Sequence, residues 1–62
     1  MDQELIAQIM TVRQSGKTNM LDIRNVQLVA LALDCYDLAE YLSDRRNVKE
    51  YCKFILYGKG GR

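Results

Sequence analysis

The stretch DIRNVQLVALAL, residues 22–33, decides what kind of fold this chain can form. Its second half, residues 28–33, is apolar on every side, and a helix of that composition is normally buried on every side. A short chain has too few other helices to cover it, so we expect a second subunit to cover Leu28 and Leu31. The apolar residues that recur at the spacing of one helix face are Ile23, Val26, Ala30 and Leu33.

The same apolar spacing recurs on both sides of this stretch. We predict helices over residues 3–14, 22–33, 36–44 and 48–57, with boundaries good to about two to four residues. No segment alternates at the period of a strand. The expected fold is therefore all-α, a small bundle of three to four short helices completed by oligomerisation. Residues 1–59 form its single domain, and residues 60–62 form a flexible tail.

Polar residues mark the expected helix ends. Short acceptor side chains cap helix starts, an acidic residue three positions later strengthens the cap, and glycine favours the left-handed turn that ends a helix. The candidate caps are Asp2 for the first helix, Asp22 or Asn19 for the second, Asp34 with Asp37 for the third, and Asn47 with Glu50 for the fourth; Gly16 and Gly58 are the candidate stops of the first and fourth helices.

The size of the chain favours self-association. It has 62 residues, of which 48% are hydrophobic and 27% charged, as in globular domains. A core this small supplies only about 3–5 kcal/mol of net stability, so a disulfide, a metal or a partner subunit usually supports it. There is no His for a zinc site, and we expect Cys35 and Cys52 to be reduced, small hydrophobes. A partner copy is the remaining support.

Catalysis is not expected. Nucleophilic catalysis needs a base beside an activated nucleophile, and the chain has no His. Residues 15–18, Ser-Gly-Lys-Thr, resemble the end of a phosphate-binding loop, but position 11 is Thr where that loop has Gly. We expect no cofactor and no bound metal. The longest apolar run, residues 28–33, is far too short to span a membrane, and no signal peptide is apparent, so we expect a cytoplasmic protein.

Charge is distributed unevenly along the chain. Residues 34–44 contain four acidic and no basic side chains, whereas residues 45–62 contain six basic and one acidic. Such asymmetry can mark a partner-facing surface or can be a solvated face beside a basic tail. The acidic residues of 36–44 would repel phosphates, so this segment is not a DNA recognition helix. The basic residues of 48–57, with Tyr51 and Tyr57, leave a weaker nucleic-acid surface.

Several polar and aromatic residues are candidates for partner binding. The connector after the first helix carries hydrogen-bonding groups and a cation near a helix start, where anions are favoured. Tyrosine suits interfaces because it offers a large apolar ring and a hydroxyl. We expect Tyr41 and Tyr51 at the edge of the core. The candidate binding residues are Lys17, Thr18, Asn19, Tyr36, Tyr57 and Lys59.

The sequence over residues 4–59 resembles a family of short phage and prophage proteins without an assigned function. The resemblance rests mainly on Gly-Lys-Thr-Asn-Met at residues 16–20, Val-Gln at 26–27, Phe-Ile at 54–55 and Gly-Lys at 58–59. The chain departs from the pattern at residues 34–35, which are Asp-Cys instead of Met-Gly, and in its extra tail, residues 60–62. The resemblance implies a small protein in the cytoplasm of a bacterial host.

Three functional hypotheses follow. The first is an oligomeric protein that binds and inhibits a host defence protein. The second is an oligomeric sponge for a small anionic nucleotide signal, held by Lys17, Thr18 and Asn19. The third is a small nucleic-acid-binding regulator that uses the basic end of the chain. The phage setting and the defence target come from the resemblance, not from the residues themselves.

Overall fold

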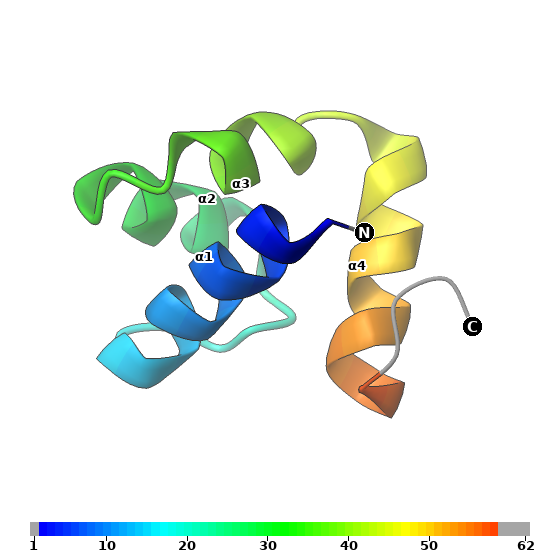
Figure 1. Ribbon diagram of the computed structural model, residues 1–62, viewed down its shortest axis with the longest axis horizontal. Coiled ribbons are helices and arrows are strands. Elements are labelled where there is room, and N and C mark those ends of the chain that lie inside the picture. The colour runs from blue at the N-terminus through cyan, green and yellow to red at the C-terminus, as the bar shows by residue number, and fades with distance from the viewer. Residues whose placement is uncertain (1, 59–62) are drawn as a thin grey trace.

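The computed structural model describes residues 2–58 and confirms the all-α prediction. Four helices run in chain order, and no strand occurs within the described range: α1 (Gln3–Ser15), α2 (Ile23–Ala32), α3 (Tyr36–Tyr41) and α4 (Arg45–Tyr57). Helices α1, α2 and α3 pack against one another, while α4 stands at one side of them (Figure 1). None of the described helices is long and apolar enough to cross a membrane.

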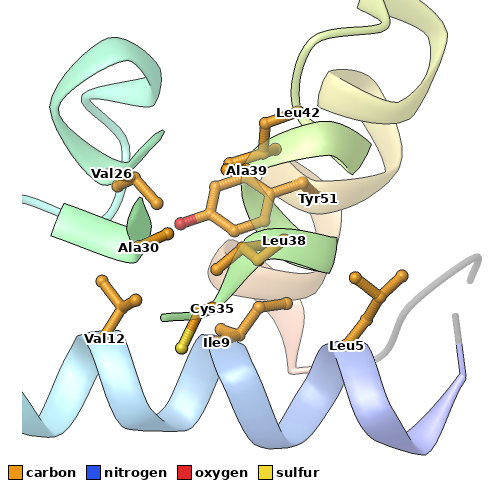
Figure 2. Packing of buried hydrophobic residues seen from close by; sticks show 10 residues of the cluster. All are labelled: Leu5, Ile9, Val12, Val26, Ala30, Cys35, Leu38, Ala39, Leu42 and Tyr51. Atoms are coloured by element: carbon orange, nitrogen blue, oxygen red, sulfur yellow. The ribbon is translucent and has the colours of Figure 1, made fainter. Parts of the chain in front are cut away.

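A single apolar core lies between the four helices. Tyr51 of α4, which was expected at the edge of the core, instead reaches its centre between side chains of α2 and α3 and is fully buried (Figure 2). Its hydroxyl donates a hydrogen bond to the main-chain oxygen of Met20 at 2.6 Å. Tyr51 is the one buried residue of α4, and it is therefore the main anchor of that helix in the core. The buried apolar set is Leu5, Ile9, Val12, Val26, Ala30, Cys35, Leu38, Ala39, Leu42 and Tyr51.

The ends of the first two helices lie within one residue of the predicted positions. The Asp2 carboxylate accepts a hydrogen bond from the Leu5 N–H at 2.8 Å and so caps α1. Gly16 ends α1 in the left-handed conformation, with φ of 67°. The Asp22 carboxylate accepts from the Asn25 N–H at 3.3 Å and caps α2. The capping residues in the first half of the chain were therefore sufficient to predict where α1 and α2 begin and end.

The prediction that Asp34 caps α3 is wrong. Asp34 has a left-handed φ of 62° and ends α2 instead. Its N–H donates to the Leu31 oxygen at 3.2 Å, and the Cys35 N–H donates to the Ala30 oxygen at 2.7 Å. These two bonds form the Schellman arrangement that closes a helix, in which the left-handed residue is usually glycine. The residue before α3 is Cys35, which makes no side-chain cap.

The boundary between the third and fourth helices lies within the predicted margin of two to four residues, but the predicted cap of the fourth helix is wrong. Helix α3 ends at Tyr41 and α4 begins at Arg45, three residues earlier than expected. The cap of α4 is Asp44, whose carboxylate accepts from the Arg46 N–H at 2.9 Å, and not Asn47 with Glu50. Asn47 lies inside α4 and donates through Nδ2 to the Tyr41 oxygen at 3.1 Å, so it closes the end of α3.

Long-range side-chain hydrogen bonds hold α3 in place. Gln27 of α2 donates through Nε2 to the Ala39 oxygen at 3.0 Å, and the Tyr41 hydroxyl donates to the Glu50 carboxylate of α4. No buried side-chain nitrogen or oxygen among the described residues lacks a hydrogen-bond partner. The buried polar side-chain atoms of this part of the chain are therefore paired within the chain itself.

Candidate functional site

The outer side of α2 carries two exposed leucines. Val26 and Ala30 on the inner side of this helix are fully buried, whereas Leu28 and Leu31 are 59% and 48% exposed. Residues three apart on a helix are neighbours, so the two leucines form one apolar strip, called here the α2 ridge. The other helices thus cover only one side of α2, and the other side is open within residues 2–58.

Other large apolar side chains are exposed as well. They are Met10, Leu21, Tyr36, Leu56 and Tyr57. Singly exposed apolar residues are common on protein surfaces. The α2 ridge differs because it places two leucines side by side on a helix that Gln27 fixes to α3. It therefore offers a preformed apolar contact.

Two of the residues predicted to bind a partner, Thr18 and Asn19, instead make hydrogen bonds that stabilise the connector between α1 and α2. The Thr18 hydroxyl oxygen accepts from Nδ2 of Asn25 at 2.8 Å. The Asn19 side-chain oxygen accepts from the Leu21 N–H at 2.9 Å, which forms a tight local turn. The Lys17 side chain is exposed. Of the three residues, Lys17 is the one whose side chain is not engaged in holding the connector.

The start of α2 does not favour an added anion. The carboxylate of Asp22 already accepts from a main-chain N–H there, and a negative side chain at this position balances the positive end of the helix dipole. A phosphate bound at the same place would meet that carboxylate. The geometry of Thr18, Asn19 and Asp22 therefore supports a structural role more than a preformed nucleotide site.

Tyr36 and Tyr57 are exposed, as predicted, but they do not come together. Tyr36 begins α3 and Tyr57 ends α4, and these two helix ends lie far apart in the molecule (Figure 1). The Tyr36 hydroxyl donates to the Asp34 carboxylate at 2.8 Å, and this bond raises the pKa of Tyr36. Lys59, the remaining candidate, lies outside the described residues. The predicted binding residues therefore form no single site.

The structure reveals a hollow that sequence reasoning found only in part. It lies between the start of α1, helix α3 and the turn into α4, and it encloses about 500 Å³. The predicted acidic stretch supplies three of its carboxylates, while Asp2 and Glu4 join from the beginning of the chain. No basic side chain lines it. We call it the acidic hollow; its lining residues are Asp2, Glu4, Leu5, Asp37, Glu40, Tyr41, Ser43, Asp44 and Asn47.

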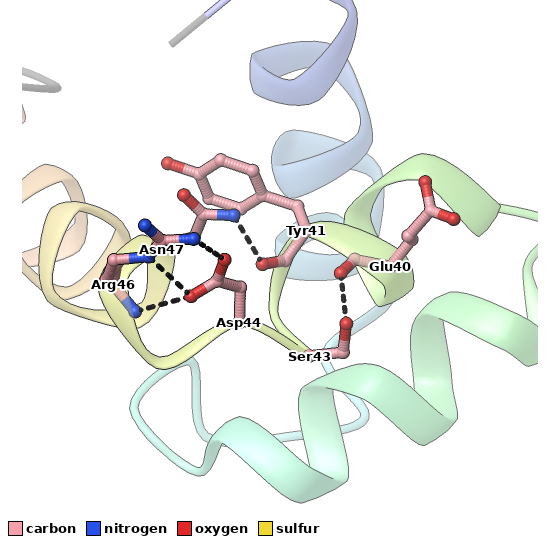
Figure 3. A network of polar contacts seen from close by, with 6 residues as sticks. All are labelled: Glu40, Tyr41, Ser43, Asp44, Arg46 and Asn47. Atoms are coloured by element: carbon pink, nitrogen blue, oxygen red, sulfur yellow. Dashed lines mark hydrogen bonds and ion pairs between the residues drawn. The ribbon is translucent and has the colours of Figure 1, made fainter.

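Several residues that line the acidic hollow take part in a network of hydrogen bonds (Figure 3). Asp44 forms an ion pair with the Arg46 guanidinium at 3.0 Å, and the hydrogen bonds from Arg46 lower the pKa of Asp44. The Ser43 hydroxyl donates a hydrogen bond to the main-chain oxygen of Glu40 at 2.6 Å. Among the described residues, no group of three acidic, His or Cys side chains converges enough to hold a metal ion. The hollow is thus an acidic surface without a metal centre in the part of the chain that the structure describes.

The outer side of α4 carries the opposite charge. Arg45, Lys49 and Lys53 follow one another at four-residue spacing, Arg46 lies beside them, and all four are exposed. Residues at that spacing share one side of a helix. We call this surface the basic face. The cluster of basic residues expected from the sequence therefore lies on the side of α4 that points away from the core residue Tyr51.

Both thiols are free. Cys35 is buried, and burial, followed by the nearby Asp34 carboxylate, raises its pKa. Cys52 is half-buried on α4. A thiol with a raised pKa stays protonated and is a poor nucleophile at neutral pH.

The comparisons with known proteins give one match. The model of a family described as a domain of unknown function, DUF5049, matches residues 1–59. No curated protein and no solved structure matches the chain.

Proposed function

We propose that this chain, which belongs to the DUF5049 family, is a non-enzymatic interaction protein that binds another protein through the α2 ridge. The partner that we propose is a host protein in a bacterial cell, which the chain inhibits by covering part of its surface. The phage setting and the inhibition rest on the resemblance to short phage proteins.

The observation that carries this proposal is the exposure of Leu28 and Leu31, which lie outside the buried core. Fully burying one leucine side chain contributes about 1.5–3 kcal/mol. Leu28 and Leu31 are 59% and 48% exposed, so covering what remains would contribute about half of that for each, roughly 1.5–3 kcal/mol for the pair. Arg24 and Gln27 lie one turn before them on α2 and give the strip polar neighbours, as at the rim of many interfaces.

The two other hypotheses receive less support from the geometry. A nucleotide sponge would use Lys17, Thr18 and Asn19, but two of these side chains hold the connector. A nucleic-acid regulator would use the basic face of α4, and the exposed cations there favour it. Nucleotide absorbance that accompanies the purified protein would favour the sponge. Steeply salt-dependent DNA binding would favour the regulator.

Affinity purification from bacterial host cells tests the α2 ridge. The chain, the variant Leu28→Ser/Leu31→Ser and the control Leu56→Ser are compared; Leu56 is exposed by 59%, the same fraction as Leu28, but lies on α4. We expect the parent and the control to retain a stoichiometric partner that the ridge variant loses. Equal recovery with the ridge variant would contradict the proposal.

The mass of the recovered partner separates the two kinds of occupant. A host protein on the ridge supports the proposal. If the only polypeptide lost from the ridge variant is a second 7.2 kDa copy, the ridge is instead the oligomer interface expected from the sequence. Circular dichroism of each variant establishes that it is folded before binding is compared.

A further inference from the structure

The charged side chains of the folded chain gather on two different surfaces. The acidic hollow joins five carboxylates from α1, α3 and the turn before α4. The basic face places four cations on the outside of α4. Within residues 2–58, Arg46 and Asp44 form the one ion pair, so the other charges on these two surfaces form no ion pair in the described part of the chain. Each surface would be stabilised by an opposite charge brought from outside.

The basic face is accessible without any rearrangement of the fold. Helix α4 stands at the side of the other three helices (Figure 1) and is anchored from its inner side by Tyr51. Half-buried Val48 and Ile55 pack on the core from the same inner side. The opposite side, with Lys49 and Lys53, is therefore an unpartnered helix face in the described part of the chain.

We propose that a second copy of this chain docks on that face, with the basic face of each α4 lying against the acidic hollow of the other copy. The two surfaces are complementary in charge and lie on the same molecule. A two-fold arrangement, the commonest among homo-oligomers, would therefore form the same contact twice. This inference goes beyond the proposed function and uses residues outside the α2 ridge.

A second copy explains both surfaces, whereas a nucleic acid explains only one. A polyanion would complement Lys49 and Lys53, but the carboxylates of the acidic hollow lie near the start of the same helix and would repel it. The acidic hollow would also remain without a partner. Charge complementarity of both surfaces therefore favours a copy of this chain over a nucleic acid.

The strength of the contact can be bounded. Exposed ion pairs contribute only about 0–1 kcal/mol each, so the charges orient the two copies more than they hold them. The aliphatic stems of Lys49 and Lys53, packed over Leu5 and Tyr41 in the hollow, would add apolar contact. Association should therefore be modest in affinity and sensitive to salt.

A charge-swap experiment tests this arrangement by sedimentation at low and high ionic strength. The first variant, Lys49→Glu/Lys53→Glu, reverses the basic face, and the second, Glu4→Lys/Glu40→Lys, reverses the hollow. The control Arg13→Glu/Arg24→Glu makes the same change of net charge as the first variant, at exposed cations elsewhere. We expect the parent and the control to dimerise. Each reversed variant alone should form homodimers with a Kd at least about tenfold higher than that of the parent, which is equivalent to about 1.4 kcal/mol.

The decisive measurement is the mixture of the two reversed variants. In a heterodimer each acidic α4 meets a basic hollow and each basic α4 meets an acidic hollow, so dimers should return. Salt at about 1 M, where the screening length is about 3 Å, should weaken the parent dimer. If a reversed variant fails to fold, the neutral pairs Lys49→Gln/Lys53→Gln and Glu4→Gln/Glu40→Gln replace it.

Three results would overturn the inference. The parent could sediment as a monomer at low salt, the reversed variants could dimerise as strongly as the parent, or the mixture could stay monomeric. Binding of double-stranded DNA by a monomeric parent would assign the basic face to nucleic acid instead. The variant Leu28→Ser/Leu31→Ser should dimerise normally, so failure here is distinct from failure of the proposed function.

Discussion

Gln8 of α1 caps the start of α3 by accepting a hydrogen bond from the Leu38 main-chain N–H at 2.8 Å. The same side chain donates through Nε2 to the Asp37 carboxylate at 3.3 Å. Because Cys35 makes no side-chain cap, a residue 30 positions earlier supplies the acceptor that a local cap normally provides. A six-residue helix depends strongly on such help, since short helices are unstable alone.

Replacing this cap should destabilise the whole domain. We expect Gln8→Ala to lower the free energy of unfolding by about 0.5–2 kcal/mol, which is the range for losing a helix cap. The control is Gln14→Ala, a glutamine of the same helix that is exposed. Urea denaturation of both variants measures the difference. Equal stabilities of the two variants would show that the Gln8 bond contributes nothing.

Asp34 is a site where glycine should improve stability. Its φ of 62° lies in the left-handed region, which a side chain disfavours and glycine adopts freely. We expect Asp34→Gly to raise the free energy of unfolding by about 0.5–1 kcal/mol, because the exposed bond from Tyr36 contributes little. Asp34→Ala, which keeps the strain and loses the tolerance of Asp, should be less stable than the parent. Thermal denaturation ranks the three proteins.

The first half of the fold could be predicted because its signals are local. Asp2, Gly16 and Asp22 each act on the helix beside them, so residue type and spacing suffice. The second half was predicted less well: the start of α3 at Tyr36 and the end of α4 before Gly58 match the prediction, whereas the end of α3 involves a contact from α4. Asp44 and Asn47 are both good caps by type; in the structure the Asp44 carboxylate accepts from the Arg46 N–H, while Asn47 lies inside α4 and donates through Nδ2 to the Tyr41 oxygen of α3.

The candidate surfaces also differ in how far the sequence could predict them. Exposure of Leu28 and Leu31 follows from an excess of apolar residues on α2, which the sequence displays directly. The acidic hollow was visible only as the cluster in residues 34–44, because Asp2 and Glu4 join it through the packing of α1 on α3. The structural role of Thr18 was missed because its partner, Asn25, belongs to the next helix.

Tyr51 should make stability fall at alkaline pH. Burial raises its pKa to about 12 from the usual 10.0. Between these values the unfolded chain loses the phenol proton while the folded chain keeps it, so the folded state becomes less favourable as pH rises above about 10. The loss approaches the order of 2–3 kcal/mol by pH 12, because each pKa unit corresponds to about 1.4 kcal/mol.

Comparison of Tyr51→Phe with Tyr57→Phe isolates this effect. Near neutral pH, Tyr51→Phe should be less stable than the parent by about 1 kcal/mol, because the Met20 oxygen loses its donor. Above pH 10 this difference in the free energy of unfolding should become smaller, because the parent loses stability as Tyr51 ionises in the unfolded chain, whereas phenylalanine does not ionise. Tyr57 is exposed, so Tyr57→Phe should follow the parent at every pH. Parallel curves for the parent and Tyr51→Phe would contradict the assignment.

The two cysteines should react at different rates. Cys35 is buried and has a raised pKa, whereas Cys52 is half-buried. We expect a thiol reagent at neutral pH to modify Cys52 first and Cys35 only as the domain opens. The variants Cys35→Ala and Cys52→Ala assign the two phases. Denatured protein, purified without oxidation, should yield two free thiols, and a yield of none would mean that a disulfide forms.

The connector separates a residue that supports the fold from one that is free to bind. The Asn19 side chain accepts from the Leu21 N–H, so Asn19→Ala should cost about 1 kcal/mol, which lowers the melting temperature of a domain this small by roughly 4–8 °C. The Lys17 side chain is exposed, and we expect Lys17→Ala to melt within a few degrees of the parent. If Lys17 belongs to the binding surface, as the sequence predicts, Lys17→Ala should retain less of the partner recovered by affinity purification. Unchanged recovery would leave Lys17 a solvated lysine and confine partner binding to the α2 ridge.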